Sequence, residues 1–227
     1  MDIYKFVFNR LEENTMIVSG AAGRCVIVDP GCLEKEERSA VLEKLSRKGL
    51  TPEAILVTHG HIDHTYGVAE LQRLFSIPVY MSAEDIPIME YYQRISKFGI
   101  RTPDISFTVT PVSDGDKISA GGLEFQVITT PGHSPGGVCY YERSQKALFT
   151  GDTLFRGTIG RTDLEGGDYD SLITSIMEKL LLLDPDVTVY PGHGSTTTIG
   201  EERMANPFLE PFNEREEIPE LNPDNYV

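Results

Sequence analysis

The stretch "LVTHGHIDHTYG", residues 56–67, places three histidines and one aspartate directly after an apolar run. The chain has only 5 histidines in total. The apolar run is typical of a buried strand, and the glycines within and after the motif indicate a loop. The segment therefore predicts a strand that delivers His59, His61, Asp63 and His64 to one loop at its end.

The two remaining histidines occur in loops of the same kind. His133 lies in "VITTPGHSPGG" (127–137) and His193 in "VTVYPGHGST" (187–196), each after a strand-like run and within a Pro-Gly-His tripeptide. Asp152 ends another such run, "ALFTGD" (147–152). Imidazole and carboxylate are ligands that suit zinc, iron or manganese. Seven such side chains exceed what one tetrahedral ion needs, and they predict two ions that share a bridging carboxylate.

The order of elements predicts an α/β fold with a single domain. We expect strands over 3–8, 14–20, 25–31, 53–58, 77–82, 107–110, 136–142, 147–152 and 186–190, and a β-rich stretch over 117–130. Helices are expected over 34–49, capped by Gly49, over 68–75, over 83–98 with an interruption at Pro87, and over 169–183. Strands in series with flanking helices suggest two sheets packed face to face with helices on their outer faces.

The composition predicts a soluble cytoplasmic protein. No apolar run reaches the roughly 18 residues of a membrane span, and the first residues lack the pattern of a secretory signal. Cys25, Cys32 and Cys139 form no CxxC pair, so we expect them to fill the core in a reducing compartment. Lys plus Arg is 20 and Asp plus Glu is 35, a net charge of −15. Without a basic cluster, this charge argues against nucleic-acid binding.

The motif "THGHIDH" (58–64) resembles the HxHxDH signature of the metallo-β-lactamase fold, and the order His133, Asp152, His193 is similar to the remaining ligand motifs. The segments "TGDTLF" (150–155) and "PGHG" (191–194) look most like the glyoxalase II branch, with Asp152 where one subclass of zinc β-lactamases has cysteine. The resemblance covers residues 3–205. It implies an αβ/βα sandwich of two mixed sheets, with metal ions at the edge of the sheets.

The resemblance also implies the ligand sets of two divalent ions, zinc first and iron or manganese as alternatives. It assigns His59, His61 and His133 to the first ion and Asp63, His64 and His193 to the second, with Asp152 bridging them. A metal ion lowers the pKa of bound water to about 7, so it supplies a nucleophile at neutral pH. Asp63 and Asp152 are thus the carboxylates nearest the expected chemistry, Asp63 as a ligand that could also steer the nucleophile.

The tail 206–227 is acidic and contains prolines, and it is too short for the helical domain that holds glutathione in full-length glyoxalase II. The catalytic domain is expected over 1–205. The segments "IGRTDLEGGD" (159–168) and "NPFL" (206–209) resemble those of short bacterial glyoxalase II-like proteins. In that family a basic residue at the position of Arg161 contacts the thiol substrate, and an aromatic residue usually stands where this chain has Asp163.

Three residues have two interpretations each. Asp29, in "VIVDPG", is either a turn residue before proline or a hydrogen-bond acceptor for a ligand histidine. Arg161 is either a substrate contact or a surface charge paired with Asp163. Tyr92, like its neighbour Tyr91, is expected in the core or on the surface rather than against substrate.

We expect a hydrolase for a small-molecule thioester such as S-lactoylglutathione, because a thiolate leaves without a separate general acid. The alternative is a persulfide dioxygenase that holds one iron through His59, His133 and Asp152. A non-catalytic metal-binding or interaction protein is disfavoured, since all seven ligand positions are filled. RNA processing and β-lactam hydrolysis are disfavoured by charge and by motif context. The oligomeric state is left open.

Overall fold

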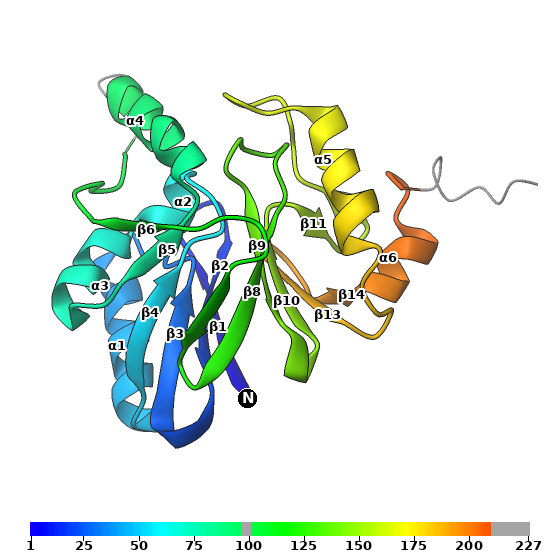
Figure 1. Cartoon of the computed structure of the whole chain (residues 1–227). Helices are drawn as coiled ribbons and strands as arrows, with labels where there is room; N and C mark the ends of the chain where they lie inside the picture. The colour runs from blue at the N-terminus through cyan, green and yellow to red at the C-terminus, as the bar shows by residue number, and fades with distance from the viewer. Residues whose placement is uncertain (97–100, 210–227) are drawn as a thin grey trace, which may run out of the picture.

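Two mixed β-sheets face each other at the centre of the computed structural model, which describes residues 1–96 and 101–209 (Figure 1). Within these residues each sheet has six strands. The first sheet runs in the order β1 (Asp2–Phe8), β2 (Glu13–Ser19), β3 (Arg24–Val28), β4 (Thr51–Leu56), β5 (Val79–Met81) and β6 (Val109–Pro111). The second runs in the order β14 (Thr197–Thr198), β13 (Thr188–Pro191), β10 (Ala147–Gly151), β9 (Val138–Glu142), β8 (Leu123–Thr129) and β7 (Lys117–Ala120).

Strand direction decides where the loops of each sheet gather. Strands β3, β4, β5 and β6 pair in parallel, and so do β10 and β13 of the second sheet. The carboxyl ends of parallel strands meet at one edge of a sheet, which is where open α/β sheets bind their ligands. The loops after β4, β10 and β13 carry histidines and Asp152, so the strand directions bring these loops together.

The core is built from strands that are apolar on both faces. On β3, Val26 and Val28 face the second sheet, while Cys25 and Ile27 face the helices outside the first sheet. Side chains alternate between the two faces of a strand, so a continuous apolar run can fill two layers of core at once. Tyr140 of β9 lies between the sheets, and its hydroxyl donates to the carbonyl of Val57.

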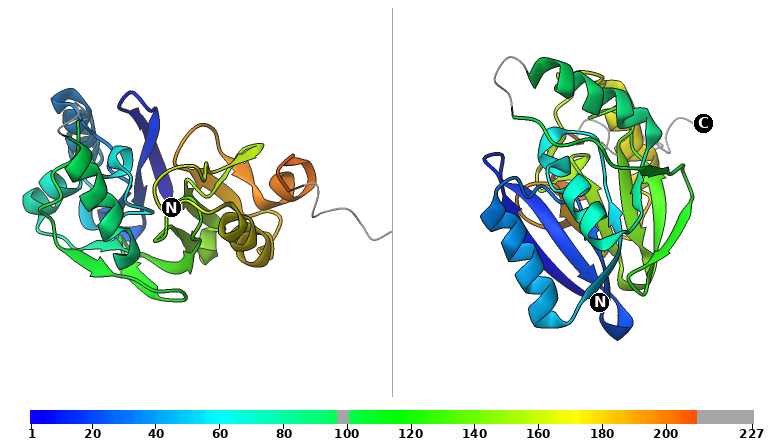
Figure 2. Two further views of the ribbon diagram at one scale, coloured as in Figure 1. Left: turned by 90° about the horizontal axis from the view of Figure 1, so that it is seen from above. Right: turned by 90° about the vertical axis from the view of Figure 1, so that its left-hand side faces the viewer.

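Helices cover both outer faces, as Figures 1 and 2 show, and this confirms the predicted αβ/βα sandwich. Outside the first sheet lie α1 (Lys35–Lys48), α3 (Val68–Phe75) and α4 (Ile86–Ile95), and outside the second lie α5 (Tyr169–Ser175) and α6 (Ile199–Ala205). Gly49 ends α1 at φ 62°, a left-handed conformation that glycine adopts without strain, as predicted.

Two predicted helices differ from the observed ones. Pro87 does not interrupt a helix, because a 3₁₀ turn (Ala83–Asp85) precedes it and Pro87 stands in the first turn of α4. Proline is favoured there, since its missing N–H has no helical acceptor. The helix predicted over 169–183 is α5 followed by a π-helical turn (Ile176–Leu180), and it ends before Leu183. Residues 97 and 98 of the predicted 83–98 helix lie outside the described residues.

Several short elements escaped prediction, among them α2 (Ile62–Thr65), the β11–β12 ribbon (Leu154–Phe155 and Thr158–Ile159), β14 and α6. After α6, Asn206 donates to the carbonyl of Thr158, and Leu209 packs in the core beside the second sheet. The predicted division at 205/206 stays a prediction, and residues 210–227 of the tail lie outside the described part. None of the described helices is both long and apolar enough to cross a membrane.

Candidate metal centre

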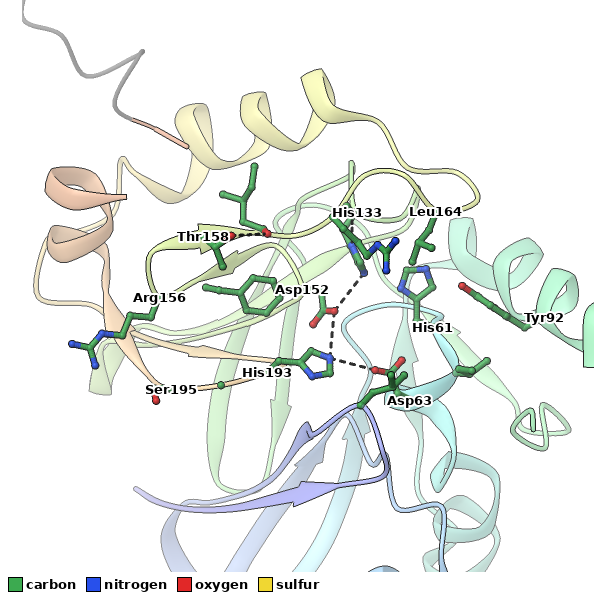
Figure 3. Close-up of a pocket in the computed structure, with 16 residues that line it drawn as sticks. His61, Asp63, Tyr92, His133, Asp152, Arg156, Thr158, Leu164, His193 and Ser195 are labelled. Carbon is green, nitrogen blue, oxygen red and sulfur yellow. Dashed lines mark hydrogen bonds and ion pairs between the residues drawn. The ribbon is translucent and has the colours of Figure 1, made fainter. Parts of the chain in front are cut away.

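All seven predicted ligands lie close together, although they come from four distant segments of the chain. Figure 3 shows five of them, His61, Asp63, His133, Asp152 and His193. Asp152 lies at the centre, with Oδ1 3.4 Å from Nε2 of His64 and Oδ2 3.5 Å from Nε2 of both His133 and His193. Nε2 of His193 also lies 3.3 Å from Oδ2 of Asp63. The loops after parallel strands therefore meet as the strand directions require.

The ligand atoms fall into groups whose members lie within 4.8 Å of one another. One group contains His59, His61 and His133 and is called the three-histidine group below. A second contains Asp63, His64 and His193 and is called the mixed group. Asp152 forms a third group with His59 and His64, and so lies between the other two. These groups match the two ligand sets that the resemblance implies. Metal binding by these residues stays a prediction.

Three buried imidazole nitrogens show whether these residues suit a metal ion. Nε2 of His59, His61 and His133 is buried and has no hydrogen-bond partner within the described chain. A buried polar atom left without a partner costs about 1–3 kcal/mol, so three of them at one point need a compensating ligand. Neutral imidazole beside carboxylate is the donor set that zinc, iron and manganese accept. The residues therefore fit a metal centre.

Outer partners hold the ring orientations. Nδ1 of His59 lies 3.0 Å from Oγ1 of Thr58, which in turn donates to Oδ2 of Asp29 at 2.7 Å. Nδ1 of His64 lies 3.1 Å from the same Asp29 oxygen, and Nδ1 of His133 lies 2.7 Å from the carbonyl of Arg161. Such partners fix the imidazole so that Nε2 faces the ion. Of the two interpretations of Asp29, the acceptor for a ligand histidine is the one the geometry supports.

The two groups differ in charge. Burial, together with His64, holds the pKa of His59 well below its usual range, and burial with His133 lowers the pKa of His61 to about 3. Burial also opposes the charge of His64, but the carboxylates of Asp152 and Asp63 raise its pKa well above the usual value. Burial opposes the charge of His193 too, but the hydrogen bond that His193 donates to Asp63, together with the Asp152 carboxylate, raises its pKa. Without metal, the histidines of the mixed group therefore bind protons more tightly than His59 and His61 do.

A cavity of about 600 Å³ opens onto the cluster. Its walls are largely apolar and include Leu11, Ile62, Phe155 and Leu164, with Ser195 and Arg156 at one end (Figure 3). Its size suits a small molecule, because ligand pockets typically enclose about 300–1,000 Å³. The cluster thus lies where a bound molecule would reach it.

Arg161 and Tyr92 both line this cavity. The Arg161 guanidinium is also paired with Asp163, with Nε 2.7 Å from Oδ1 and Nη2 2.8 Å from Oδ2, and contact between Arg161 and substrate stays a prediction. Tyr92 is half-buried at the cavity, where its ring packs edge-on against His61 with centroids 5.7 Å apart, and the prediction that it does not contact substrate stays a prediction. Helical spacing alone does not reveal that α4 turns this face toward the cluster.

Asn14 contributes to the site without any signal in the sequence. Its Nδ2 donates to the carbonyls of Pro191 and Gly194, on either side of His193. Glu13 and His193 also pair as an isolated antiparallel bridge. The start of β2 therefore holds the His193 loop, and only the folded chain brings these positions together.

A sequence profile described as "Metallo-beta-lactamase superfamily" matches residues 9–193. The chain belongs to this superfamily. Hydroxyacylglutathione hydrolase GloC of Haemophilus influenzae is 33% identical over 216 residues, which cover 92% of this chain and 99% of GloC. The probable metallo-hydrolase YqgX of Bacillus subtilis is 38% identical over 193 residues, which cover 83% of this chain and 89% of YqgX. The protein is accordingly a metallo-hydrolase of this superfamily.

Solved structures show the same fold. The BLEG-1 B3 metallo-beta-lactamase is 36% identical with a TM-score of 0.83, and the match covers 92% of this chain and 99% of that one. TTHA1623 in a di-iron-bound form is 39% identical with a TM-score of 0.79, covering 91% and 100%. ETHE1 from Myxococcus xanthus is 27% identical with a TM-score of 0.76, covering 91% and 84%. The His/Asp cluster on this fold has the composition of a dinuclear metal site.

Proposed function

We propose that the protein is a binuclear metal-dependent hydrolase that cleaves small thioesters such as S-lactoylglutathione. One observation carries the proposal. Nε2 of His59, His61 and His133 is buried without a hydrogen-bond partner, and His61 and His133 line a cavity that fits a small molecule together with Asp152. The similarity to GloC, named as a hydroxyacylglutathione hydrolase, supports the substrate class. Zinc as the resident metal and a cytoplasmic location belong to the same proposal.

In this mechanism the chain's own residues hold and orient the reacting groups. Divalent ions bound at the two groups would supply a nucleophile at neutral pH and stabilise charge on the carbonyl oxygen. Asp152 lies between the groups and keeps them close together, while Asp29 and Thr58 fix the rings of His64 and His59. Asp63 completes the mixed group from the first turn of α2.

The cavity walls would position the thioester. Leu11, Phe155 and Leu164 offer apolar contacts, and Arg161 offers a cation at the rim. Burial raises the pKa of Tyr92, so its hydroxyl stays protonated at neutral pH and can donate a hydrogen bond to the substrate. No proton donor to the leaving group is required, because a thiolate is stable at neutral pH relative to an alkoxide.

A persulfide dioxygenase is the second candidate. Similarity to ETHE1 supports it, and the di-iron-bound TTHA1623 structure is that of a relative containing iron. In this alternative one iron is held by His59, His133 and Asp152, and the mixed group has no role in metal binding. The number of bound ions therefore separates the two candidates.

One preparation can decide between them. We would purify the protein with zinc, manganese or iron supplied, count metal ions by mass spectrometry, and assay thiol release from S-lactoylglutathione and oxygen uptake with glutathione persulfide. A β-lactam chromogen completes the substrate panel, because one relative is a B3 metallo-beta-lactamase. We expect close to two ions per chain and thioester hydrolysis. One ion per chain with oxygen uptake would establish the dioxygenase instead.

A further inference from the structure

Asp85 is a buried carboxylate with no part in the ligand groups. It ends the 3₁₀ turn Ala83–Asp85, between β5 and α4, and is 0% exposed. Its Oδ2 accepts hydrogen bonds from the backbone N–H of Gly60 at 2.7 Å and from Oγ of Ser134 at 2.7 Å. Its Oδ1 accepts from the backbone N–H of Gly136 at 2.5 Å. Both carboxylate oxygens are therefore engaged by fixed donors.

These donors belong to the two loops that carry the three-histidine group. Gly60 lies between His59 and His61, and Ser134 directly follows His133. The first loop extends from the first sheet, after β4, and the second loop connects β8 and β9 of the second sheet. A single carboxylate thus joins the two halves of the molecule beside one ligand group.

The loops also approach the Asp85 backbone closely. A Cβ atom on Gly60 would lie 2.8 Å from the carbonyl oxygen of Asp85, and one on Gly136 would lie 2.6 Å from its backbone nitrogen. Such distances are too short for any side chain, so both positions need glycine. The packing leaves little freedom for either loop to shift relative to Asp85.

The mixed group is held by different residues. Asp29 accepts from Nδ1 of His64, and Asn14 donates to the carbonyls on either side of His193. Among the described residues, the hydrogen bonds to the Asp85 side chain come instead from Gly60, between His59 and His61, and from Ser134 and Gly136 after His133. Asp29 reaches the three-histidine group only through Thr58 and His59, so Asp85 is a support of that group that bonds to neither His64 nor His193.

We propose that Asp85 is a positioning residue that sets the metal affinity of the three-histidine group and leaves that of the mixed group unchanged. The inference rests on the metal site of the proposed function. Removing the carboxylate leaves two buried N–H groups without acceptors, and the loops separate to reach water. The three Nε2 atoms then no longer meet at one point. Outer residues of this kind typically change metal affinity by about 10- to 100-fold.

The test measures zinc affinity by competition with a chromophoric chelator. Asp85→Asn keeps the size of the side chain but presents an N–H to at least one donor. It is combined with His193→Ala, which leaves only the three-histidine group intact, and with His61→Ala, which leaves only the mixed group intact. We expect Asp85→Asn to weaken zinc binding at least tenfold in the His193→Ala background and to change it less than twofold in the His61→Ala background.

Two controls separate positioning from general destabilisation. Asp114→Asn removes a carboxylate that also accepts from a backbone N–H and a hydroxyl, those of Thr129, but stands away from the cluster. It should leave both zinc affinities unchanged. Ser134→Ala removes one of the three donors to Asp85. It should lower the zinc affinity of the three-histidine group by a smaller factor than Asp85→Asn does. Thermal unfolding of each metal-free variant reports whether it is folded.

The outcomes are distinct. The role of Asp85 would be overturned if Asp85→Asn lowers the zinc affinity of both groups equally, or if it leaves the zinc affinity of the three-histidine group unchanged. If Asp85→Asn does not fold, the Ser134→Ala result decides the question in the same backgrounds. If the wild-type chain binds a single ion, at the three-histidine group, the proposed binuclear function is overturned. The effect of Asp85→Asn on the affinity for that ion then still tests the role of Asp85. A chain that binds no zinc at the three-histidine group overturns both.

Discussion

The Asp29 carboxylate accepts a hydrogen bond from Nδ1 of His64 at 3.1 Å, and both side chains are buried. The same carboxylate accepts from the backbone N–H and the hydroxyl of Thr58. Asp29 has φ 44°, in the left-handed region that aspartate and asparagine tolerate better than most residues. Asp29, directly after β3, thus forms a turn and also orients the predicted ligand His64.

Replacing Asp29 with asparagine should weaken zinc binding at the mixed group more than at the three-histidine group, because Asp29 contacts His64 directly and reaches His59 only through Thr58. Asparagine tolerates the same backbone conformation, but its amide cannot accept from His64 and Thr58 together. We expect zinc affinity at the mixed group to fall by about 10- to 100-fold, the usual effect of losing an outer partner. Chelator competition in the His61→Ala background measures it. An unchanged affinity there would show that His64 needs no partner.

Replacing Asp152 with alanine should abolish turnover. The side chain lies within 3.5 Å of His64, His133 and His193, so its loss removes the carboxylate that lies between both groups. We expect kcat for thioester hydrolysis to fall by about three orders of magnitude or more, because metal-activated water carries most of the proposed chemistry. Asp170→Ala, an exposed change on α5, is the control. Turnover at the wild-type rate with both ions in place contradicts the mechanism.

Metal binding to the metal-free protein should release more protons from the mixed group than from the three-histidine group. The pKa values of His64 and His193 are raised, so both imidazoles bind protons more tightly than a free imidazole does, and metal must displace these protons. These protonated forms stabilise the metal-free fold below pH about 6.5, and the contribution is lost as pH rises through the raised pKa values. Affinity at the mixed group should therefore fall as pH falls.

The three-histidine group provides the internal comparison. His61 has a pKa of about 3 and that of His59 is also lowered, so both are neutral at pH 7 and release no proton. Calorimetry in two buffers of different ionisation enthalpy counts the protons. We expect more protons to be released per bound ion in the His61→Ala background than in the His193→Ala background. Equal counts in the two backgrounds would contradict the assigned charges.

Arg161 should affect KM more than kcat. Its guanidinium lines the cavity but is paired with Asp163, whose carboxylate competes with an anionic substrate. We expect Arg161→Ala to raise KM for S-lactoylglutathione about tenfold with little change in kcat, the result of losing one charge-assisted contact. Asp163→Ala should lower KM, because it frees the guanidinium. Arg143→Ala, over the ring of Tyr141 at another site, is the matched control. If neither Arg161→Ala nor Asp163→Ala alters KM, Arg161 is a surface charge.

The sequence predicts those elements that are determined by a few neighbouring residues. The spacing of apolar residues predicts the helix over 68–75, and Gly49 predicts the end of the preceding helix; the structure confirms both. The ligand loops were also readable, because each combines a strand end, a glycine and a histidine or aspartate. The αβ/βα arrangement followed from the order of elements and from the resemblance together.

Supports that join distant segments could not be predicted in the same way. Asn14 bonds to Pro191 across 177 positions, and Asp85 bonds to Gly136 across 51. Neither residue differs in its local sequence from an ordinary strand or turn residue. Their roles depend on the docking of the two sheets, which no window of a few residues encodes.

The partition of the ligands between the two sheets has a consequence for the lifetime of the folded chain. His64 and His193 are 129 positions apart, and contacts between such distant positions form late because loop closure costs entropy first. Metal would then bind only after the sheets have docked, beyond the folding transition state. Interactions that form after the transition state slow unfolding and leave the folding rate unchanged. Metal supply should therefore govern how long each molecule persists once folded, rather than how quickly it folds.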